Sequence, residues 1–360
     1  WSAENPEKVT LLNRIRSGAL PEGLAAALPQ FEAGKAVSTR VASGKVINAV
    51  AGVMPEFWGG SADLAGSNNT IIDGAPSFFP AERSSKVFVG NEFGRNLHFG
   101  IREHAMGAIM NGIAVDGLTR VYGATFFVFA DYMRGAVRLA ALMDLPVTYV
   151  WTHDSIGVGE DGPTHQPVEH LTAYRAIPGL AVVRPGDGDE TTYAWLGILE
   201  NRAPAALILS RQNLPNPGRG EGTGLASAEG VLRGGYVLKD SEGTPDVILM
   251  ASGSELSLAL EAAETLSATG VAVRVVSMPC MEWFEAQPKE YRDSVLLPEV
   301  TNRVSVEAGL AMPWQKYLGD AGSAVSIETF GAVGSPKELF QHFGVTADAV
   351  VAAAQRGLPS

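Results

Sequence analysis

Short apolar runs alternate along the chain with segments whose apolar residues recur every three or four positions. The runs predict buried strands, and the recurring positions predict helices with one buried face. The expected strands are residues 87–89, 120–129, 146–151, 180–183, 205–209, 247–250, 271–276, 303–306 and 324–327. The expected helices are residues 7–16, 36–52, a segment from 102, a segment from 132, 191–199, 254–268, 336–343 and 347–354. This alternation predicts an α/β fold of mainly parallel sheets covered by helices.

A glycine- and proline-rich stretch divides this pattern in two. Residues 213–230, NLPNPGRGEGTGLASAEG, show neither periodicity and are predicted to link two α/β units. A length of 360 residues also favours two domains over one. The second unit shows few clustered titratable groups, so its expected role is assembly or regulation, and the chemistry is expected in the first unit.

Composition narrows the class of partner. The chain has 27 Lys and Arg against 39 Asp and Glu, a net charge of −12, which argues against a general nucleic-acid surface and against anionic membranes. A single cysteine, Cys280, permits no intrachain disulfide and favours a cytoplasmic protein; it is predicted to be buried and structural. The start, WSAENPEK, is not a secretory signal, and no apolar run approaches the length of about 20 residues that a membrane span needs.

One loop concentrates the candidate chemistry. Residues 152–171, THDSIGVGEDGPTHQPVEHL, hold three of the six histidines, His153, His165 and His170, together with four acids. The loop follows the strand predicted at 146–151, and α/β proteins commonly place their sites where a strand opens into a loop. A functional site is therefore favoured over a surface loop with incidental histidines.

Three other features have a structural explanation on spacing alone. Glu103 would be a favourable acid in the first turn of its helix. Phe126, Phe129 and Tyr132, spaced by three, are more often core residues than a platform for a cofactor. The Gly-Asp-Gly triplet at 186–188 has no apolar strand leading directly into it, so it is predicted to be a turn that caps a helix rather than a metal site.

Several longer motifs closely resemble those of the transketolase family. They are GGSADL at 59–64, GIREHAM at 100–106, TFFVFADY at 125–132, the loop at 152–171 and SRQNLP at 210–215. The resemblance covers essentially the whole chain but only the second half of a transketolase. It implies a connector at 1–34, a pyrimidine-binding domain at 35–215, a linker at 216–230 and a C-terminal domain at 231–360. The family's preceding domain, which binds the diphosphate and metal of thiamine diphosphate, is expected to be absent from this chain.

The resemblance also implies how this chain would contact thiamine diphosphate. Glu103 would be catalytic, hydrogen-bonding the aminopyrimidine ring nitrogen. Phe126, Phe129 and Tyr132 would enclose the pyrimidine ring, which replaces the core-only interpretation of these aromatics. Asp63 would support the cofactor or the subunit interface. No metal ligand is expected in this chain, because the divalent metal, Mg²⁺ or Ca²⁺, belongs with the diphosphate-binding domain.

The implied substrates are sugar phosphates. Arg40 and Arg211, with Ser67 and His153, match the positions that hold the phosphate, and two arginines suit a dianion. Asp161 would accept a hydrogen bond from a substrate hydroxyl. His165 would be catalytic, shuttling protons or stabilising oxygen charge as a C–C bond breaks. The remaining histidines are expected to be structural: His98, His104, His170 and His342.

The implied function is transfer of a two-carbon ketol unit from a ketose phosphate to an aldose phosphate in the pentose phosphate pathway. Because the family's site lies between domains of two subunits, this chain alone is expected to be inactive and to bind neither cofactor nor metal tightly. Its expected partners are a second copy, in a homodimer, and the missing domain, from the same gene or a separate subunit. The alternatives are half of another thiamine-diphosphate enzyme (deoxyxylulose-phosphate-synthase-like or 2-oxo acid dehydrogenase β-type) and a non-catalytic assembly or regulatory fragment.

Overall fold

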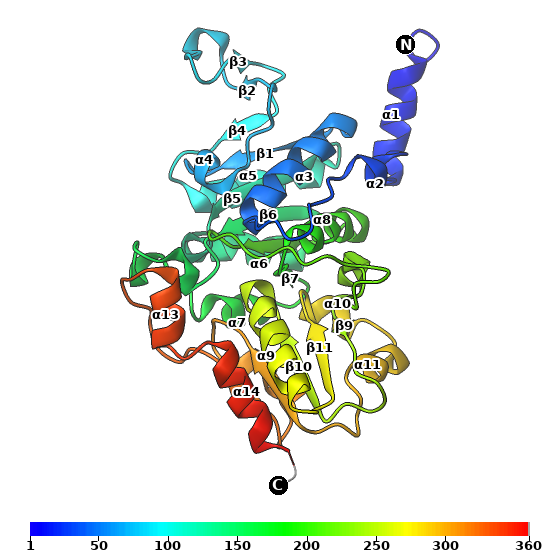
Figure 1. Cartoon of the computed structure of the whole chain (residues 1–360). Helices are drawn as coiled ribbons and strands as arrows, with labels where there is room; N and C mark the ends of the chain where they lie inside the picture. Colours follow the sequence, from blue (N-terminus) through cyan, green and yellow to red (C-terminus); the bar gives the residue numbers. More distant parts are fainter. Residues whose placement is uncertain (359–360) are drawn as a thin grey trace.

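A computed structural model of the chain describes residues 1–358 and shows two α/β units in succession (Figure 1). The N-terminus lies beside the first unit and the C-terminus at the far end of the second (Figure 1). Each unit is a mainly parallel sheet covered by helices, so the predicted fold class is confirmed. None of the helices within residues 1–358 has the length and apolarity needed to cross a bilayer.

The first unit is built on an eight-stranded sheet in the order β3-β2-β4-β1-β5-β6-β8-β7. Every neighbouring pair runs parallel. All strands therefore end at the same edge, where α/β proteins bind ligands. The strands are β1 (Phe57–Ser61), β2 (Ser77–Phe78), β3 (Gly90–Asn91), β4 (Asn96–His98), β5 (Arg120–Phe126), β6 (Val147–Thr152), β7 (Ala181–Val183) and β8 (Ala205–Leu209).

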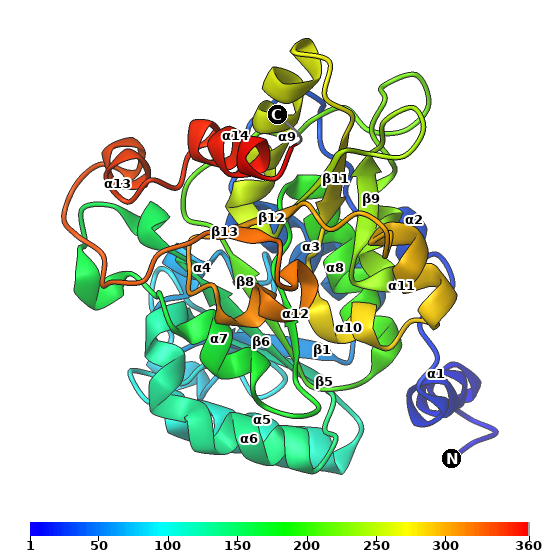
Figure 2. The same cartoon turned by 90° about the horizontal axis from the view of Figure 1, so that it is seen from below.

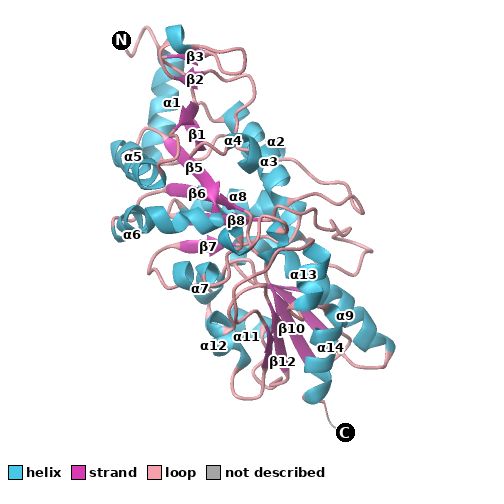
Figure 3. Cartoon of the chain, turned by 90° about the vertical axis from the view of Figure 1, so that its left-hand side faces the viewer, coloured by secondary structure: helices cyan, strands magenta, loops and turns pink. Residues whose placement is uncertain are grey.

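Helices cover both faces of this sheet, with α5 and α6 on one face and α3 and α8 on the other (Figure 3). The α-helices are α1 (Pro6–Ser17), α2 (Leu24–Ala27), α3 (Thr39–Val53), α4 (Ala65–Asn68), α5 (Glu103–Asp116), α6 (Arg134–Leu142), α7 (His170–Arg175) and α8 (Gly188–Asn201). The 3₁₀ turns are η1 (Ala81–Arg83), η2 (Phe127–Met133), η3 (Ile156–Val158), η4 (Pro163–His165) and η5 (Ala228–Arg233).

Burial on both faces explains why the central strands are continuously apolar. In β6, Tyr149 and Trp151 pack with the core under α5 and α6, whereas Val150 packs with the core under α3 and α8. All six residues of β6 are buried. A strand with no solvent face has no polar alternation, which is typical of parallel sheets.

The second unit has a five-stranded sheet in the order β13-β12-β10-β11-β9, in which only β9 runs antiparallel to its neighbour. Its helices α9 and α14 pack side by side (Figure 2). The strands are β9 (Tyr236–Lys239), β10 (Val247–Ala251), β11 (Val273–Ser277), β12 (Arg303–Val306) and β13 (Ser323–Val325). The helices and turns are η6 (Gly253–Glu255), α9 (Leu256–Ala268), α10 (Met281–Glu285), α11 (Lys289–Val295), η7 (Met312–Trp314), α12 (Gln315–Leu318), α13 (Pro336–His342) and α14 (Ala347–Arg356).

Two local predictions are wrong. Residues 87–89 do not form a strand, because the Ser85 hydroxyl accepts hydrogen bonds from the backbone of Val87 and Phe88 and closes a turn there. The short strand β3 begins only at Gly90. Tyr132 does not begin a helix either: it lies in the 3₁₀ turn η2, and α6 starts at Arg134.

Candidate active site

The carboxyl edge of the large sheet collects residues that are far apart in the sequence. Asp63 follows β1, Glu103 begins the helix after β4, Phe126 ends β5, His153 follows β6, and Arg211 follows β8. Because these five strands are parallel, their ends share one edge. The fold thus brings these five predicted site residues to the same edge of the sheet.

Aromatic rings form one wall of this edge. The rings of Phe126 and Phe129 stack with centroids 5.7 Å apart, and Tyr132 lies 6.1 Å beyond Phe129. The ring of His165 meets Phe129 edge-on at 5.4 Å. Tyr132 is 69% exposed. The aromatic wall therefore has an uncovered side that can receive a flat ring.

His153 is fixed in place by stacking and by a chain of hydrogen bonds. Its ring stacks on Phe126 with centroids 3.7 Å apart. Ser61 Oγ donates to Asn68 Oδ1, Asn68 Nδ2 donates to Thr152 Oγ1, and Thr152 Oγ1 lies against His153 Nδ1, each at 2.7 Å. Since the Thr152 hydroxyl accepts from Asn68, its own proton can be donated to Nδ1, and in that arrangement the proton of the neutral imidazole is on Nε2. The φ of His153 is +66°, a strained value of the kind that accumulates at functional sites.

Two arginines face this histidine. Ser210 N donates to Thr39 Oγ1 at 2.7 Å, and Thr39 N donates to Ser210 Oγ at 3.1 Å, so the start of α3 is tied to the end of β8. This pairing brings Arg40 and Arg211, the next residue on each segment, close together. Burial, together with the charges of Arg40, Arg211 and His165, lowers the pKa of His153 to about 3. His153 is therefore neutral near pH 7.

The positive charge at this point has no carboxylate partner among residues 1–358. Burial and the neighbouring Arg211 lower the pKa of Arg40. Arg40 Nη1 donates to the backbone oxygen of Ser67 at 2.7 Å, but its buried Nε has no hydrogen-bond partner. Within residues 1–358, neither arginine forms an ion pair with a carboxylate. Two guanidinium groups without a carboxylate partner, one of them with a buried and unused Nε donor, suit an anion.

Glu103 is a buried carboxylate at the N-terminus of α5. It is 8% exposed, and the part of the chain that the structure describes offers it no hydrogen-bond or ion-pair partner. A carboxylate is favoured at the N-terminus of a helix, and one without a partner among the described residues has free capacity to accept a hydrogen bond from a ligand.

Three predicted residues stand apart from these contacts. Ser67 reaches the site only through its backbone oxygen, which Arg40 contacts. Asp161 is exposed in the turn between η3 and η4, and Asp63 is exposed with a φ of +63°. No hydrogen bond or ion pair of Asp161 or Asp63 to the aromatic wall is present among the described residues.

A buried ionic network lies behind the loop and was not predicted from the sequence. Arg184 is fully buried, and its guanidinium bonds Asp154 Oδ2 at 2.7 Å and Glu255 Oε2 at 2.5 Å. Beside it, Arg175 forms a bidentate pair with Glu307 at 2.7 and 2.9 Å. Burial would raise the pKa of Glu307, but Arg175 and Arg184 outweigh it and lower that pKa to about 2.

This network corrects the expectation that the second unit carries few clustered titratable groups. Glu255 and Glu307 belong to that unit, and they anchor Arg184 and Arg175 of the first. The same unit also touches the loop directly, since Gln166 Nε2 donates to the backbone oxygens of Gly159 and Ala332 at 2.8 and 2.9 Å. The second unit therefore supports the loop that carries His153 and His165. Residues that meet only across a domain interface leave no spacing pattern in the sequence.

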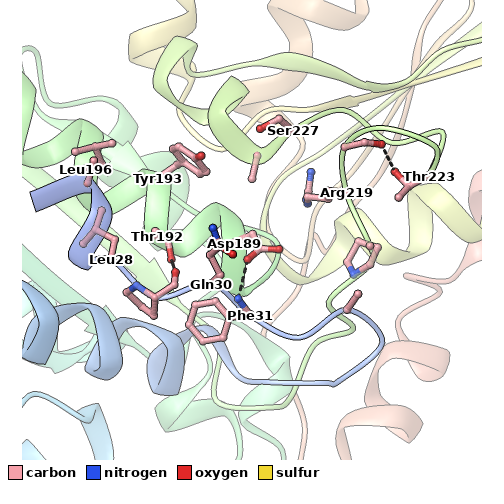
Figure 4. Close-up of a pocket in the computed structure, with 17 residues that line it drawn as sticks. Leu28, Gln30, Phe31, Asp189, Thr192, Tyr193, Leu196, Arg219, Thr223 and Ser227 are labelled. Atoms are coloured by element: carbon pink, nitrogen blue, oxygen red, sulfur yellow. Dashed lines mark hydrogen bonds between the residues drawn. The ribbon is translucent and has the colours of Figure 1, made fainter. Parts of the chain in front are cut away.

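The Gly-Asp-Gly triplet is a helix cap, as predicted. Asp187 accepts a hydrogen bond from Glu190 N at 2.8 Å at the start of α8, and it also pairs with Arg219. A cavity of about 510 Å³ lies nearby, between residues 25–33, α8 and residues 217–228 (Figure 4). Asp189 there accepts a hydrogen bond from Phe31 N (Figure 4). Arg219 also lines the cavity, but its guanidinium is already paired with Asp187. This cavity is separate from the aromatic wall.

Replacing His153 with Gln is expected to make the free energy of unfolding depend less on pH below pH 6.5. Between pH 6.5 and about 3 the unfolded state binds a proton that the folded state excludes, so stability present above pH 6.5 is lost as the pH falls. The low pKa of His153 should make the free energy of unfolding of the wild type about 2 kcal/mol smaller at pH 5 than at pH 8. Urea unfolding at several pH values measures the effect. Ser67→Ala, a change without a titratable group, should keep the wild-type slope, and equal slopes in wild type and His153→Gln would contradict the assignment.

Known proteins are similar to this chain over nearly all of its length. Residues 35–217 match the family model "Transketolase, pyrimidine binding domain", and residues 234–346 match "Transketolase-like TK C-terminal domain". A transketolase of Mycobacterium tuberculosis is 57% identical, covering 99% of this chain and 52% of its own length. One of Geobacillus stearothermophilus is 49% identical, covering 98% of this chain and 51% of its own. The chain thus spans about half the length of the curated relatives it matches.

Solved structures give the same result. A Pichia stipitis transketolase in complex with sedoheptulose 7-phosphate superposes with a TM-score of 0.91 at 42% identity, covering 99% of this chain and 51% of that one. A split-gene transketolase, described as an inactive β4 tetramer, has a TM-score of 0.69 at 24% identity, covers 90% of this chain and 99% of that one, and shares the fold. The chain belongs to the transketolase family.

Proposed function

We propose that this chain forms the pyrimidine-facing and substrate-facing wall of a transketolase site, which transfers a two-carbon ketol unit from a ketose phosphate to an aldose phosphate. The observation that carries the proposal is the pair Arg40 and Arg211, which lack carboxylate partners in the described chain and stand beside the neutral His153. An acidic protein that leaves two arginines uncompensated at one point has a local site for an anion.

The residues fit the family's cofactor, thiamine diphosphate, on two observations. Glu103 is largely buried and its carboxylate has no partner among the described residues, and the rings of Phe126, Phe129 and Tyr132 have an uncovered side. When bound, thiamine diphosphate supplies a nucleophilic carbon that protein side chains lack. Glu103 would share a proton between its carboxylate and the pyrimidine ring nitrogen, and the three aromatic rings would orient the pyrimidine and exclude water. The divalent metal would be held by a diphosphate-binding domain rather than by these residues.

The substrate would lie along the loop at 152–171. Arg40 and Arg211 would bind the phosphate, with Ser67 and His153 beside them, and the imidazole proton on Nε2 of His153 would serve as a donor. Asp161, exposed on the loop, would accept a hydrogen bond from a sugar hydroxyl. His165, whose ring lies against Phe129, would accept and return a proton at the reacting carbons.

We propose that the complete site forms in a homodimer. Apolar side chains of α5 and α6 that should be covered in an assembly are exposed: Ile109, Val115, Leu139 and Leu142. An exposed apolar surface of this kind marks a protein interface. A diphosphate-binding domain would then face the aromatic wall and close the site from the other side.

Replacing Arg40 or Arg211 with Gln is expected to lower kcat/KM for a phosphorylated sugar by about 10- to 100-fold, because each loses a charge-assisted hydrogen bond. The effect should fall on KM, since the phosphate is remote from the reacting carbons. The assay uses the chain combined with a diphosphate-binding domain. Activity on the same sugar without its phosphate is the internal control and should change little. Equal losses on both sugars would show that the arginines do not bind the phosphate.

A further inference from the structure

A second group of potential ligands lies behind the aromatic wall. Asp131, in η2, faces Glu169 and His170 at the start of α7. Asp131 Oδ2 is 3.2 Å from His170 Nε2, and Glu169 Oε2 is 3.6 Å from His170 Nδ1. One ligand atom from each residue lies within 4.8 Å of the others, and within residues 1–358 this is the one group of three such side chains. From the sequence, His170 was expected to be structural.

The imidazole of His170 is buried but unsatisfied. The residue is 4% exposed, and neither ring nitrogen makes a hydrogen bond of acceptable geometry in the described structure. Phe127 packs against the ring, edge to face, at 5.4 Å. An unpaired polar group at this depth is uncommon and requires an explanation. Each nitrogen lies near one carboxylate without a hydrogen bond of acceptable geometry to it, and the side chains of Asp131 and Glu169 are 51% and 48% exposed. A ligand can therefore enter from solvent.

The surroundings suit a bound cation. The Tyr174 hydroxyl approaches Asp131 Oδ1 at 3.4 Å, which leaves Oδ2 to face His170. A hydrogen bond to a ligating carboxylate is usual around metal sites. A nearby cation, Arg134, stacks on the Tyr174 ring at 5.2 Å and donates to the backbone oxygen of Ala173. It is thus engaged elsewhere and forms no ion pair with Asp131 or Glu169.

We propose that Asp131, Glu169 and His170 bind a divalent first-row transition ion such as Zn²⁺. The imidazole would give one nitrogen, each carboxylate one oxygen, and water would fill the open position. One nitrogen with two oxygen ligands favours such ions over Ca²⁺, which takes six to eight oxygens. Zinc bonds of about 2.0–2.2 Å require ligand atoms closer together than 4.8 Å, so the two half-exposed carboxylates would have to rotate toward the imidazole when the ion binds.

The position of this ion gives it a structural consequence. Asp131 precedes Tyr132 of the aromatic wall, and Glu169 and His170 close the loop that carries His153 and His165. Bound Zn²⁺ would link η2, which carries Phe129 and Tyr132, to the end of that loop. It is a site of this chain's own residues and does not depend on the proposed function or on the metal of the diphosphate-binding domain.

The test is metal binding by the 360-residue chain after chelator treatment and buffer exchange. Co²⁺ binding is followed by its visible absorption, and Zn²⁺ is then added as competitor. One equivalent should bind to the wild type and to His342→Gln, which removes an exposed histidine of α13 outside the cluster. Asp131→Asn and His170→Gln should each weaken binding by about 100-fold or more, since even supporting residues around a metal change affinity by 10- to 100-fold.

A thermal melt provides the second readout. Zn²⁺ in excess should raise Tm by roughly 5 °C in the wild type and in His342→Gln, and not in the two cluster variants. Asp131→Asn alters a half-exposed side chain, so it keeps the test valid if His170→Gln fails to fold. The proposal is overturned if the wild type binds no Co²⁺ at 100 μM, or if both cluster variants bind as the wild type does. It is also overturned if only His170→Gln loses binding, because the carboxylates would then not be ligands.

Discussion

Glu103→Gln is expected to lower kcat of the assembled enzyme by about 100- to 10,000-fold, the range that follows when a group that holds a proton in the reaction is lost. Gln has the same shape and can still hydrogen-bond, but it cannot share a proton. Glu103 has no partner within the described chain that could substitute for it, and it lies at the start of α5, on the edge where the other site residues meet.

The measurement is steady-state ketol transfer after the chain is combined with a diphosphate-binding domain, for example that of the Mycobacterium tuberculosis relative, thiamine diphosphate and Mg²⁺. Asp116→Asn is the matched control, because it removes an exposed carboxylate from the other end of the same helix. Its kcat should stay near that of the wild type. A kcat for Glu103→Gln within a factor of three of the wild-type value would show that Glu103 does not hold a proton that the reaction needs.

Arg184→Met should destabilise the folded chain by about 3–5 kcal/mol, the cost of leaving a buried carboxylate without its partner. The guanidinium of Arg184 bonds Asp154 on the loop and Glu255 in the second unit, and all three side chains are buried. The Met side chain has a volume similar to that of Arg, so the loss of stability would come from the missing charge rather than from a cavity. Because Asp154 follows His153, the loop should loosen together with the domain interface.

Chemical denaturation monitored by tryptophan fluorescence measures this loss. Lys289→Met is the comparison, since it breaks an exposed ion pair with Asp293 on α11. Exposed pairs contribute about 0–1 kcal/mol, so this variant should unfold close to the wild type. If the two variants lose equal stability, the buried network does not hold the units together.

The fold was predictable wherever strands are continuously apolar. Strands β6 and β8 were expected from their runs of Val, Ile, Leu and aromatic residues, which the two covered faces require. Strand β1 was not, because it contains Gly59 and Gly60. A Cβ on Gly60 would lie 1.7 Å from the backbone oxygen of Leu97, and one on Gly59 would lie 2.3 Å from the Tyr122 ring. Close packing therefore requires glycine at these two positions, and glycine does not favour a strand, so the sequence pattern did not predict β1.

The candidate site was predictable only where a motif lies on one continuous segment. The loop at 152–171 was found from its own histidines and acids, whereas the role of Phe126, Phe129 and Tyr132 was inferred from the family motif at 125–132, because their spacing alone favoured the core. Contacts between segments could not be found from the sequence, including the Thr39–Ser210 pair that aligns Arg40 with Arg211 and the links from Arg184 to Asp154 and Glu255. Partners separated by 30 to 171 positions have no shared periodicity, so only the fold reveals them.

The central claim is that this chain forms one wall of a ketol-transferring site. It is tested most directly by assaying a preparation shown by mass spectrometry to contain only these 360 residues, alone and after addition of a diphosphate-binding domain with thiamine diphosphate and Mg²⁺. We expect no transfer above background alone, and transfer from a ketose phosphate in preference to pyruvate once the domain is added. Robust transfer by the chain alone, or pyruvate as the better donor, would contradict this claim.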